Sequence, residues 1–117
     1  MPVKVKEIIK DLNLEVAAGE KGLDREITGG YCGDLLSDVM ANTSSGDLWF
    51  TIQSHQNVVA VAVLKDLAAI ILVNDRQPDE DTLAKAEEEG VPILLSTLSA
   101  FALAGRVHEM GINRSET

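Results

Sequence analysis

Apolar residues recur along the chain with two spacings, one typical of helices and one typical of strands. From residue 5 to residue 12 they follow the i, i+3, i+4, i+7 pattern of a single helix face. The residues on this face are Val5, Ile8, Ile9 and Leu12. The pattern predicts an amphipathic helix at the start of the chain.

The segment that follows is less regular. Short extended segments are predicted at 14–17 and 25–31, with a glycine-bounded turn between them. Asp34 stands just before an apolar run, so we expect it to cap a short helix over 35–40. A polar loop at 42–47 then leads into the more regular part of the chain.

From residue 48 onwards, strand and helix patterns alternate. Runs rich in branched apolar and aromatic residues predict strands at 48–52, 69–73 and 91–95. Helices are predicted at 54–67 and 78–89; the first could be read as a strand, but joining two parallel strands needs a crossover of this length. A last helix begins after Ser99, and its expected inward face is Phe101, Leu103, Ala104 and Val107.

This alternation indicates the α/β class, a layered single domain with a mostly parallel sheet flanked by helices. We expect the domain to span 1–113, with a flexible tail at 114–117. The chain has 117 residues, 45% of them hydrophobic and few of them aromatic, which suits one core built from Val, Ile, Leu and Ala.

Composition narrows the possible partners. The formal net charge of −9 repels phosphate backbones, so we expect no nucleic-acid binding. We find no apolar run of membrane-spanning length and no signal-peptide pattern, and we expect a cytoplasmic protein without membrane contact. Cys32 is the only cysteine, so no disulfide can form within the chain.

Polar clusters follow the predicted strands. In open α/β sheets, ligands bind outside the carboxyl ends of the strands, and the helix N-termini nearby favour an anion. The candidate ligand-binding residues at these positions are Gln53, Ser54, His55, Gln56, Asn57, Asn74, Ser96 and Thr97. Three of them have a plainer alternative: Ser54 as a helix cap, Asn74 with Asp75 as an ordinary turn, and His55 as a loop residue without a role.

The segment Asp24-Arg25-Glu26-Ile27-Thr28-Gly29-Gly30 is the other notable feature. Adjacent glycines permit a sharp turn or a close backbone approach to a phosphate. However, the segment lacks the Lys-[Ser/Thr] that completes a phosphate loop, so we expect Arg25, Thr28, Gly29 and Gly30 to contribute at most to the rim of a site. The alternatives are a β-bulge at the glycines and a surface ion pair of Arg25 with a neighbouring acid.

This segment resembles the motif that names the DRTGG domain family. The resemblance extends to YCGDLLSDVM at 31–40, to the strand entry at 46–49, to the loop at 53–57 and to the strand at 68–71. It implies an α/β domain similar to the N-terminal domain of HPr kinase/phosphorylase. It also implies a non-catalytic module of the kind fused to CBS domains in regulated pyrophosphatases, and one that often takes part in dimer contacts.

We therefore expect a regulatory or sensory module that forms a homodimer and binds a small anionic ligand such as a nucleotide, or a partner protein such as an enzyme. No catalytic residue, metal or cofactor is expected. One alternative is a purely structural dimerisation domain. Another is a small enzyme that uses His55 with Ser54 or Asp75 on a phosphorylated substrate.

Overall fold

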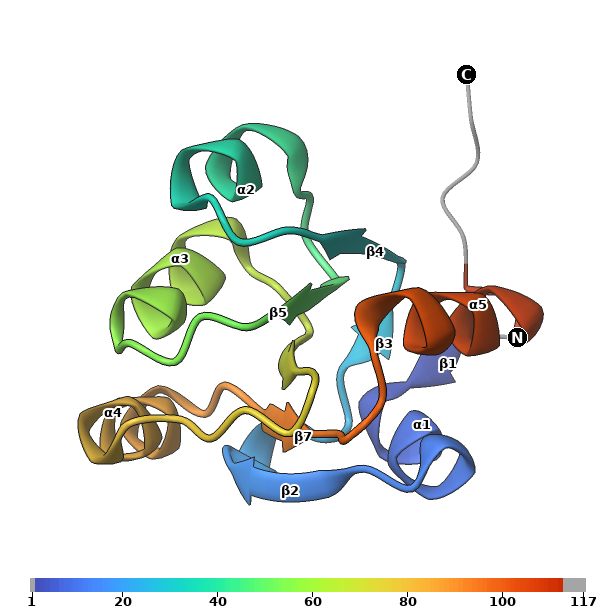
Figure 1. The fold of residues 1–117 in the computed structure, drawn as a ribbon, viewed down its shortest axis with the longest axis horizontal. Helices are drawn as coiled ribbons and strands as arrows, with labels where there is room; N and C mark the ends of the chain where they lie inside the picture. Colours follow the sequence, from blue (N-terminus) through green and yellow to red (C-terminus); the bar gives the residue numbers. More distant parts are fainter. Residues whose placement is uncertain (1, 113–117) are drawn as a thin grey trace.

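The computed structural model describes residues 2–112 and shows a five-stranded sheet between two layers of helices (Figure 1). The strand order is β2-β7-β6-β5-β4. These strands are β2 (Glu15–Ala18), β4 (Gly29–Cys32), β5 (Asp47–Thr51), β6 (Ala69–Leu72) and β7 (Ile93–Leu95). Four of them run parallel, while β2 pairs antiparallel with β7 at one edge. The predicted fold class, a mostly parallel sheet flanked by helices, is confirmed.

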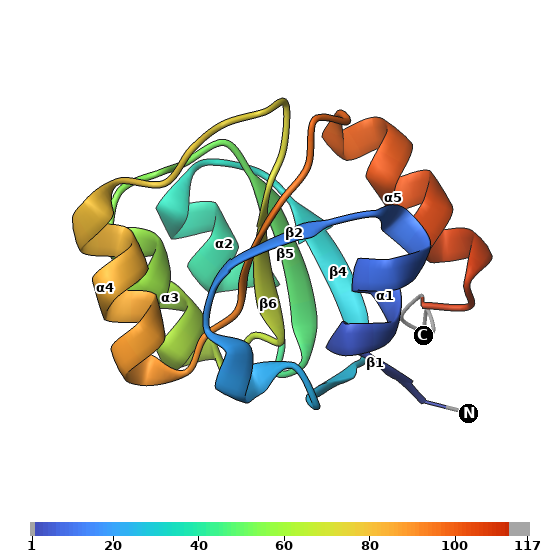
Figure 2. The same cartoon turned by 90° about the horizontal axis from the view of Figure 1, so that it is seen from below.

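Helices cover both faces of the sheet (Figure 2). One face carries α1 (Val5–Leu12) and α5 (Ala100–Glu109). The other face carries α2 (Leu36–Asn42), α3 (Asn57–Lys65) and α4 (Glu80–Glu89). A short antiparallel pair, β1 (Val3–Lys4) with β3 (Glu26–Ile27), and a 3-10 turn at Glu20–Gly22 complete the chain.

Alternation along the strands divides the core into two parts. In β5, Leu48 and Phe50 pack toward α1 and α5, whereas Trp49 packs toward the three helices of the other face. Period-two side-chain geometry requires this alternation. Since both faces are covered, β5 and β6 are buried at every position, which explains their nearly continuous apolar sequence.

Most predicted helices and strands are present, with ends shifted by up to three residues. The single extended segment predicted at 25–31 is instead two strands, β3 and β4, which belong to different sheets. The segment whose sequence fitted either a strand or a helix forms α3, the crossover between β5 and β6. The predicted tail at 114–117 lies outside the described residues. Within 2–112, no helix has the length and apolarity needed to cross a membrane.

Two side-chain predictions are wrong. Phe101 is 91% exposed, because the inward side of α5 is formed by Leu103 and Val107, and Phe101 lies about half a turn from Leu103. Asp34 does not cap α2, whose N-cap position is Leu35 without a side-chain bond. Ser99 does cap α5 as predicted, with its Oγ accepting a hydrogen bond from the Ala102 N–H at 3.2 Å.

Candidate functional site

The two groups of candidate residues lie at opposite edges of the sheet. Arg25 and Thr28 precede β4, at the edge where the parallel strands begin, whereas Gln53 follows β5 at the edge where they end. The structure therefore does not bring the motif to the rim formed by residues 53–57. We call these the amino edge and the carboxyl edge.

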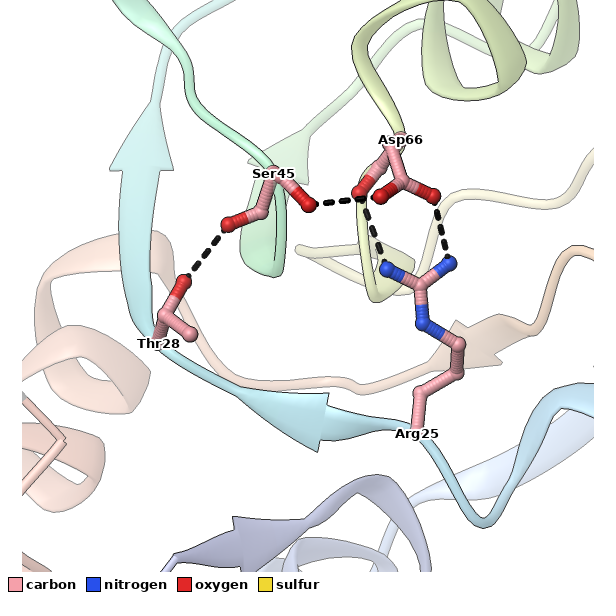
Figure 3. Close-up of polar contacts among 4 residues, drawn as sticks. All are labelled: Arg25, Thr28, Ser45 and Asp66. Atoms are coloured by element: carbon pink, nitrogen blue, oxygen red, sulfur yellow. Dashed lines mark hydrogen bonds and ion pairs between the residues drawn. The ribbon is translucent and has the colours of Figure 1, made fainter.

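At the amino edge, four side chains form a set of polar contacts that we call the clamp: Arg25, Thr28, Ser45 and Asp66 (Figure 3). The Arg25 guanidinium donates from Nη1 to Asp66 Oδ1 at 2.9 Å and from Nη2 to the Asp66 carbonyl at 3.0 Å. Ser45 Oγ donates to Asp66 Oδ2 at 2.5 Å, and Thr28 Oγ1 donates to the Ser45 carbonyl at 2.7 Å. The clamp thus ties the start of β4 to the α2–β5 loop and to the C-terminal end of α3.

Gly46 lies inside the clamp. Its carbonyl accepts from the Thr28 N–H and its N–H donates to the Asp66 carbonyl, both at 2.9 Å. Its φ is +87°, and a Cβ at this position would lie 2.5 Å from Thr28 Oγ1. The close approach in this motif therefore occurs between Thr28 and Gly46.

The glycine pair is ordinary strand. Gly29 and Gly30 pair in register with Asp47 and Leu48, so the β-bulge alternative is wrong, and neither glycine has a positive φ. A Cβ on Gly30 would make only normal contacts, the nearest at 3.5 Å. The ion-pair alternative for Arg25 is right in kind, but its partner is Asp66 rather than a neighbour in sequence.

The clamp predicts a pH-dependent contribution to stability. The hydrogen bond from Ser45, and secondly the contacts from Arg25, hold the pKa of Asp66 below its ordinary value of 3.8. A depressed carboxyl pKa adds stability above the ordinary value and loses it as the pH falls through the folded-state value. Because the Asp66 side chain is 62% exposed, we expect Asp66→Asn to lower the free energy of unfolding at pH 7 by only about 1 kcal/mol or less.

Urea unfolding of the wild type and of Asp66→Asn at pH 7 and near pH 3 checks this prediction. Asparagine tolerates the left-handed backbone of this position (φ +57°), so the variant removes the charge and one of the two acceptor oxygens without straining the backbone. The difference between the two proteins should shrink at the lower pH, and a difference that stays constant would contradict the prediction. Asp24→Asn, which removes the exposed ion pair with Lys6, is the matched control and should have a smaller effect at pH 7.

At the carboxyl edge, Gln53 and Ser54 bond to neighbouring segments of the chain, whereas His55 bonds within its own loop. Gln53 Nε2 donates to the Asp34 carbonyl at 2.8 Å, and the Ser54 carbonyl accepts from the N–H of Asp79 and from Thr82 Oγ1. His55 is exposed, and its Nδ1 accepts the Asn57 N–H at 3.2 Å. Ser54 therefore supports the start of α4 through its backbone and is not the side-chain cap of α3.

Asp34 is a structural residue of this edge that the sequence analysis placed wrongly. Its Oδ1 accepts from Thr51 Oγ1 at 2.7 Å and from the Ile52 N–H at 2.9 Å, which joins the ends of β4 and β5. The sequence does contain a signal for this role, because an acidic residue soon after a strand lies beside the end of the neighbouring strand. The preference of Asp for helix N-caps favoured the other interpretation.

The turn after β6 is joined to the end of β7. Asn74 and Asp75 both have left-handed backbones, with φ of +58° and +60°. Their N–H groups donate to the carbonyls of Leu98 and Ser96, each at 2.9 Å. The turn alternative for Asn74 and Asp75 is therefore right, and the turn also holds the segment that carries Ser96 and Thr97.

Two cavities open at the carboxyl edge. The β7-side cavity, of about 360 Å³, is lined by Asp11, Glu15, Asp75, Ser96, Thr97 and Arg106, among others. The β5-side cavity, of about 350 Å³, is lined by Cys32, Asp34, Phe50, Ile52, Val73 and Ala100, with Asn74 at its border. Of the candidate residues, the structure thus brings Ser96 and Thr97 to the first cavity and Asn74 to the second, while Gln56 borders an open acidic surface.

Charge distinguishes the two cavities. Arg106 is the cation of the β7-side lining, and its Nη2 donates to the Asp11 carbonyl at 3.2 Å. Three carboxylates, Asp11, Glu15 and Asp75, share that lining. In the β5-side cavity, desolvation and then the charge of Asp34 raise the pKa of the Cys32 thiol, so little reactive thiolate is present at neutral pH.

Among residues 2–112, no three His, Cys, Asp or Glu side chains are placed to hold a metal ion. The fold and the clamp define an α/β domain whose motif stabilises the amino edge and leaves two cavities at the opposite edge. The chain belongs to the DRTGG domain family, whose model matches residues 7–110.

The chain is also similar to two known proteins, and it spans less than half the length of each. The chain is 27% identical over 120 residues to HPr kinase/phosphorylase of Bacillus pumilus (strain SAFR-032), covering 90% of this chain and 39% of that protein. The crystal structure of the CBS and DRTGG domains of the regulatory region of Clostridium perfringens pyrophosphatase, complexed with the activator diadenosine tetraphosphate, is also similar. It has a TM-score of 0.69 and 13% identity, with 94% of this chain and 47% of that chain covered, which shows a shared fold.

Proposed function

We propose that this domain is a non-catalytic regulatory module that binds a small, nucleotide-like anion at the carboxyl edge and works as a homodimer. The observation that carries the ligand proposal is the β7-side cavity. Its volume of about 360 Å³ lies within the usual range of small-molecule sites, and it lies outside the carboxyl ends of parallel strands. Ser96, Thr97 and Arg106 line it together, and the Ser96 Oγ accepts the Leu98 N–H at 3.0 Å.

The charges around this cavity limit the ligand further. The lining contains one guanidinium, that of Arg106, and three carboxylates, those of Asp11, Glu15 and Asp75. Because each added phosphate would be repelled by these carboxylates, the lining favours a ligand of low negative charge. A nucleoside monophosphate fits this balance better than a triphosphate. The ligand in the regulatory region of the solved structure, which contains CBS domains as well as a DRTGG domain, is diadenosine tetraphosphate, which supports a nucleotide as the class of ligand but not its low charge.

The arrangement of polar groups supports a non-catalytic role. Nucleophilic catalysis needs a nucleophile, a base and an orienting group in hydrogen-bond contact. In the described part of the chain, no hydrogen bond joins the side chains of His55, Ser54 and Asp75. His55 Nδ1 accepts from its own loop, which leaves it without an orienting partner.

Isothermal titration calorimetry with AMP and ATP tests the ligand proposal. We expect AMP to bind more tightly than ATP, and Arg106→Ala to weaken AMP binding by about tenfold, as expected for the loss of one charged contact. Arg76→Ala is the matched control, because Arg76 is exposed in the turn after β6 and does not line the cavity. No binding of either nucleotide, or equal losses in the two variants, would contradict the proposal.

Binding of a partner protein is a second candidate, favoured by a different observation. Three of the large apolar side chains that are most exposed, Leu35, Leu98 and Phe101, lie in or beside the loops of the carboxyl edge. Exposed aromatic and aliphatic groups of this kind are typical of protein contacts.

A purely structural dimerisation domain is a further alternative. A chain that dimerises but binds no nucleotide would fit it.

A further inference from the structure

Phe101 protrudes from the first turn of α5 with 91% of its surface exposed. Burying a phenylalanine side chain stabilises a fold by about 1.5–3 kcal/mol, and Phe101 does not contribute this stabilisation within the described chain. A single exposed apolar residue is common in soluble proteins, and exposure alone does not indicate a site. The surroundings of Phe101 provide the further evidence.

The β5-side cavity lies beside the same helical turn. Ala100, the residue before Phe101, lines it together with Phe50, Ile52 and Val73. Its volume of about 350 Å³ is ample for an aromatic ring. An exposed aromatic ring and a largely apolar cavity large enough for such a ring therefore lie next to each other on one patch.

This juxtaposition suits a contact between two identical chains. In a two-fold dimer the same patch serves both subunits, so a residue that enters a pocket on the partner must lie beside the same pocket on its own subunit. Phe101 and the β5-side cavity meet this requirement. A different partner would fill the cavity or bind the ring without needing both on one patch.

Charge also favours a second copy at this face. Two chains of net charge −9 repel each other wherever charged surfaces meet. Residues 97–105, which form the loop before α5 and its first half, contain no charged side chain. The carboxylate of Asp34, the charged group of the cavity lining, already accepts two hydrogen bonds from the end of β5.

Gly105 provides an independent indication. It lies one helical turn after Phe101, and a Cβ there would meet nothing within 4 Å. Glycine inside a helix is less stable than alanine by roughly 1 kcal/mol, and packing within the described chain gives no reason for it. A helix backbone approaching closely from outside would give one.

We propose that a second copy of this chain covers the patch, with the Phe101 ring of each subunit inserted into the β5-side cavity of the other. The inference rests on the homodimer of the proposed function and identifies its contact. It is independent of the β7-side cavity and of nucleotide binding.

Sedimentation equilibrium of the full chain tests the contact. We expect a dimer for the wild type and, because each dimer contains the contact twice, an increase of about 100-fold in the dissociation constant for Phe101→Asp. Leu64→Asp is the matched control, since Leu64 is 70% exposed on α3, on the other face of the sheet, and should leave the constant nearly unchanged. Circular dichroism establishes that both variants are folded.

The single cysteine reports on the cavity itself. Cys32 lines the β5-side cavity, so its rate of reaction with Ellman's reagent should fall as the wild-type protein becomes dimeric with rising concentration. In Phe101→Asp the rate should not depend on protein concentration. A dimer that Phe101→Asp dissociates while Cys32 stays equally reactive would overturn the insertion of the ring.

The remaining outcomes separate this contact from the proposed function. A dimer that Phe101→Asp leaves intact would overturn the contact and keep the homodimer. A wild type that stays monomeric at every concentration would overturn both. Neither result bears on nucleotide binding, which the calorimetric comparison of the wild type with Arg106→Ala tests independently.

Discussion

Replacing Gly46 with alanine is expected to lower the free energy of unfolding by about 3 kcal/mol, the sum of an unfavourable backbone conformation and a steric clash. The φ of +87° is strained for any residue with a Cβ. The new methyl group would also stand 2.5 Å from Oγ1 and 2.9 Å from Cγ2 of Thr28. Relief requires that the Thr28 side chain move and give up its bond to the Ser45 carbonyl.

Gly111→Ala separates the two contributions. Gly111 has a φ of +90°, nearly the same as Gly46, but a Cβ there would meet nothing within 4 Å. Its replacement should cost about 1 kcal/mol, the backbone contribution alone. Denaturant unfolding of both variants checks the prediction, and equal losses would show that the contact with Thr28 has no effect.

The combination of Gly46→Ala with Thr28→Ala completes a double-mutant cycle. Removing Oγ1 and Cγ2 leaves only the Thr28 Cβ, which would be 3.2 Å from the new methyl group. The double variant should therefore be more stable than the sum of the two single losses predicts. Strict additivity would contradict the close packing of these two residues.

Replacing Trp49 with alanine is expected to have the largest effect, a loss of about 3–5 kcal/mol in the free energy of unfolding. The Trp49 side chain has no exposed surface and packs from β5 against the three-helix layer. Its Nε1 also donates to the Gly33 carbonyl at 2.8 Å, a bond next to the β5-side cavity. The substitution leaves a large cavity and an acceptor without its donor.

Trp49→Phe serves as the graded control. It keeps an aromatic ring in the core but removes the donor to Gly33, so we expect a smaller loss of about 2 kcal/mol. Unfolding followed by circular dichroism suits all three proteins, because Trp49 is the only tryptophan and fluorescence would vanish with it. A loss under about 1 kcal/mol for Trp49→Ala would contradict its place in the core.

The layered fold was predictable because its signals are local and repeat along the chain. Strand-length apolar runs at β5, β6 and β7, separated by segments long enough for a crossover, leave few alternatives to a parallel sheet. Even the ambiguous sequence of α3 was settled by this requirement. The antiparallel direction of β2 was not predicted, since nothing in four residues specifies which strand they will join.

The site was less predictable because its parts come from distant segments. The strand-end rule placed Ser96 and Thr97 beside a cavity, but Arg106 reaches the same cavity from one turn before the end of α5 and carries no signal in sequence. Phe101 fitted a helical apolar pattern. However, α5 has apolar residues on several sides, and the pattern alone does not say which of these sides faces the sheet. Arg25 and Thr28 fell at the opposite edge from the position assigned to them.

The hydrogen bonds of the clamp suggest a better sequence pattern for finding this family motif in other chains. The atoms that hold Arg25 and Thr28 belong to Ser45, Gly46 and Asp66, which lie 17 to 41 residues away from the groups they bind. A search template that joins the seven contiguous residues to a Ser-Gly pair and to a later Asp would describe the whole interacting unit. Such a discontinuous template would describe the motif by the three separate segments that it joins, rather than by its contiguous residues alone.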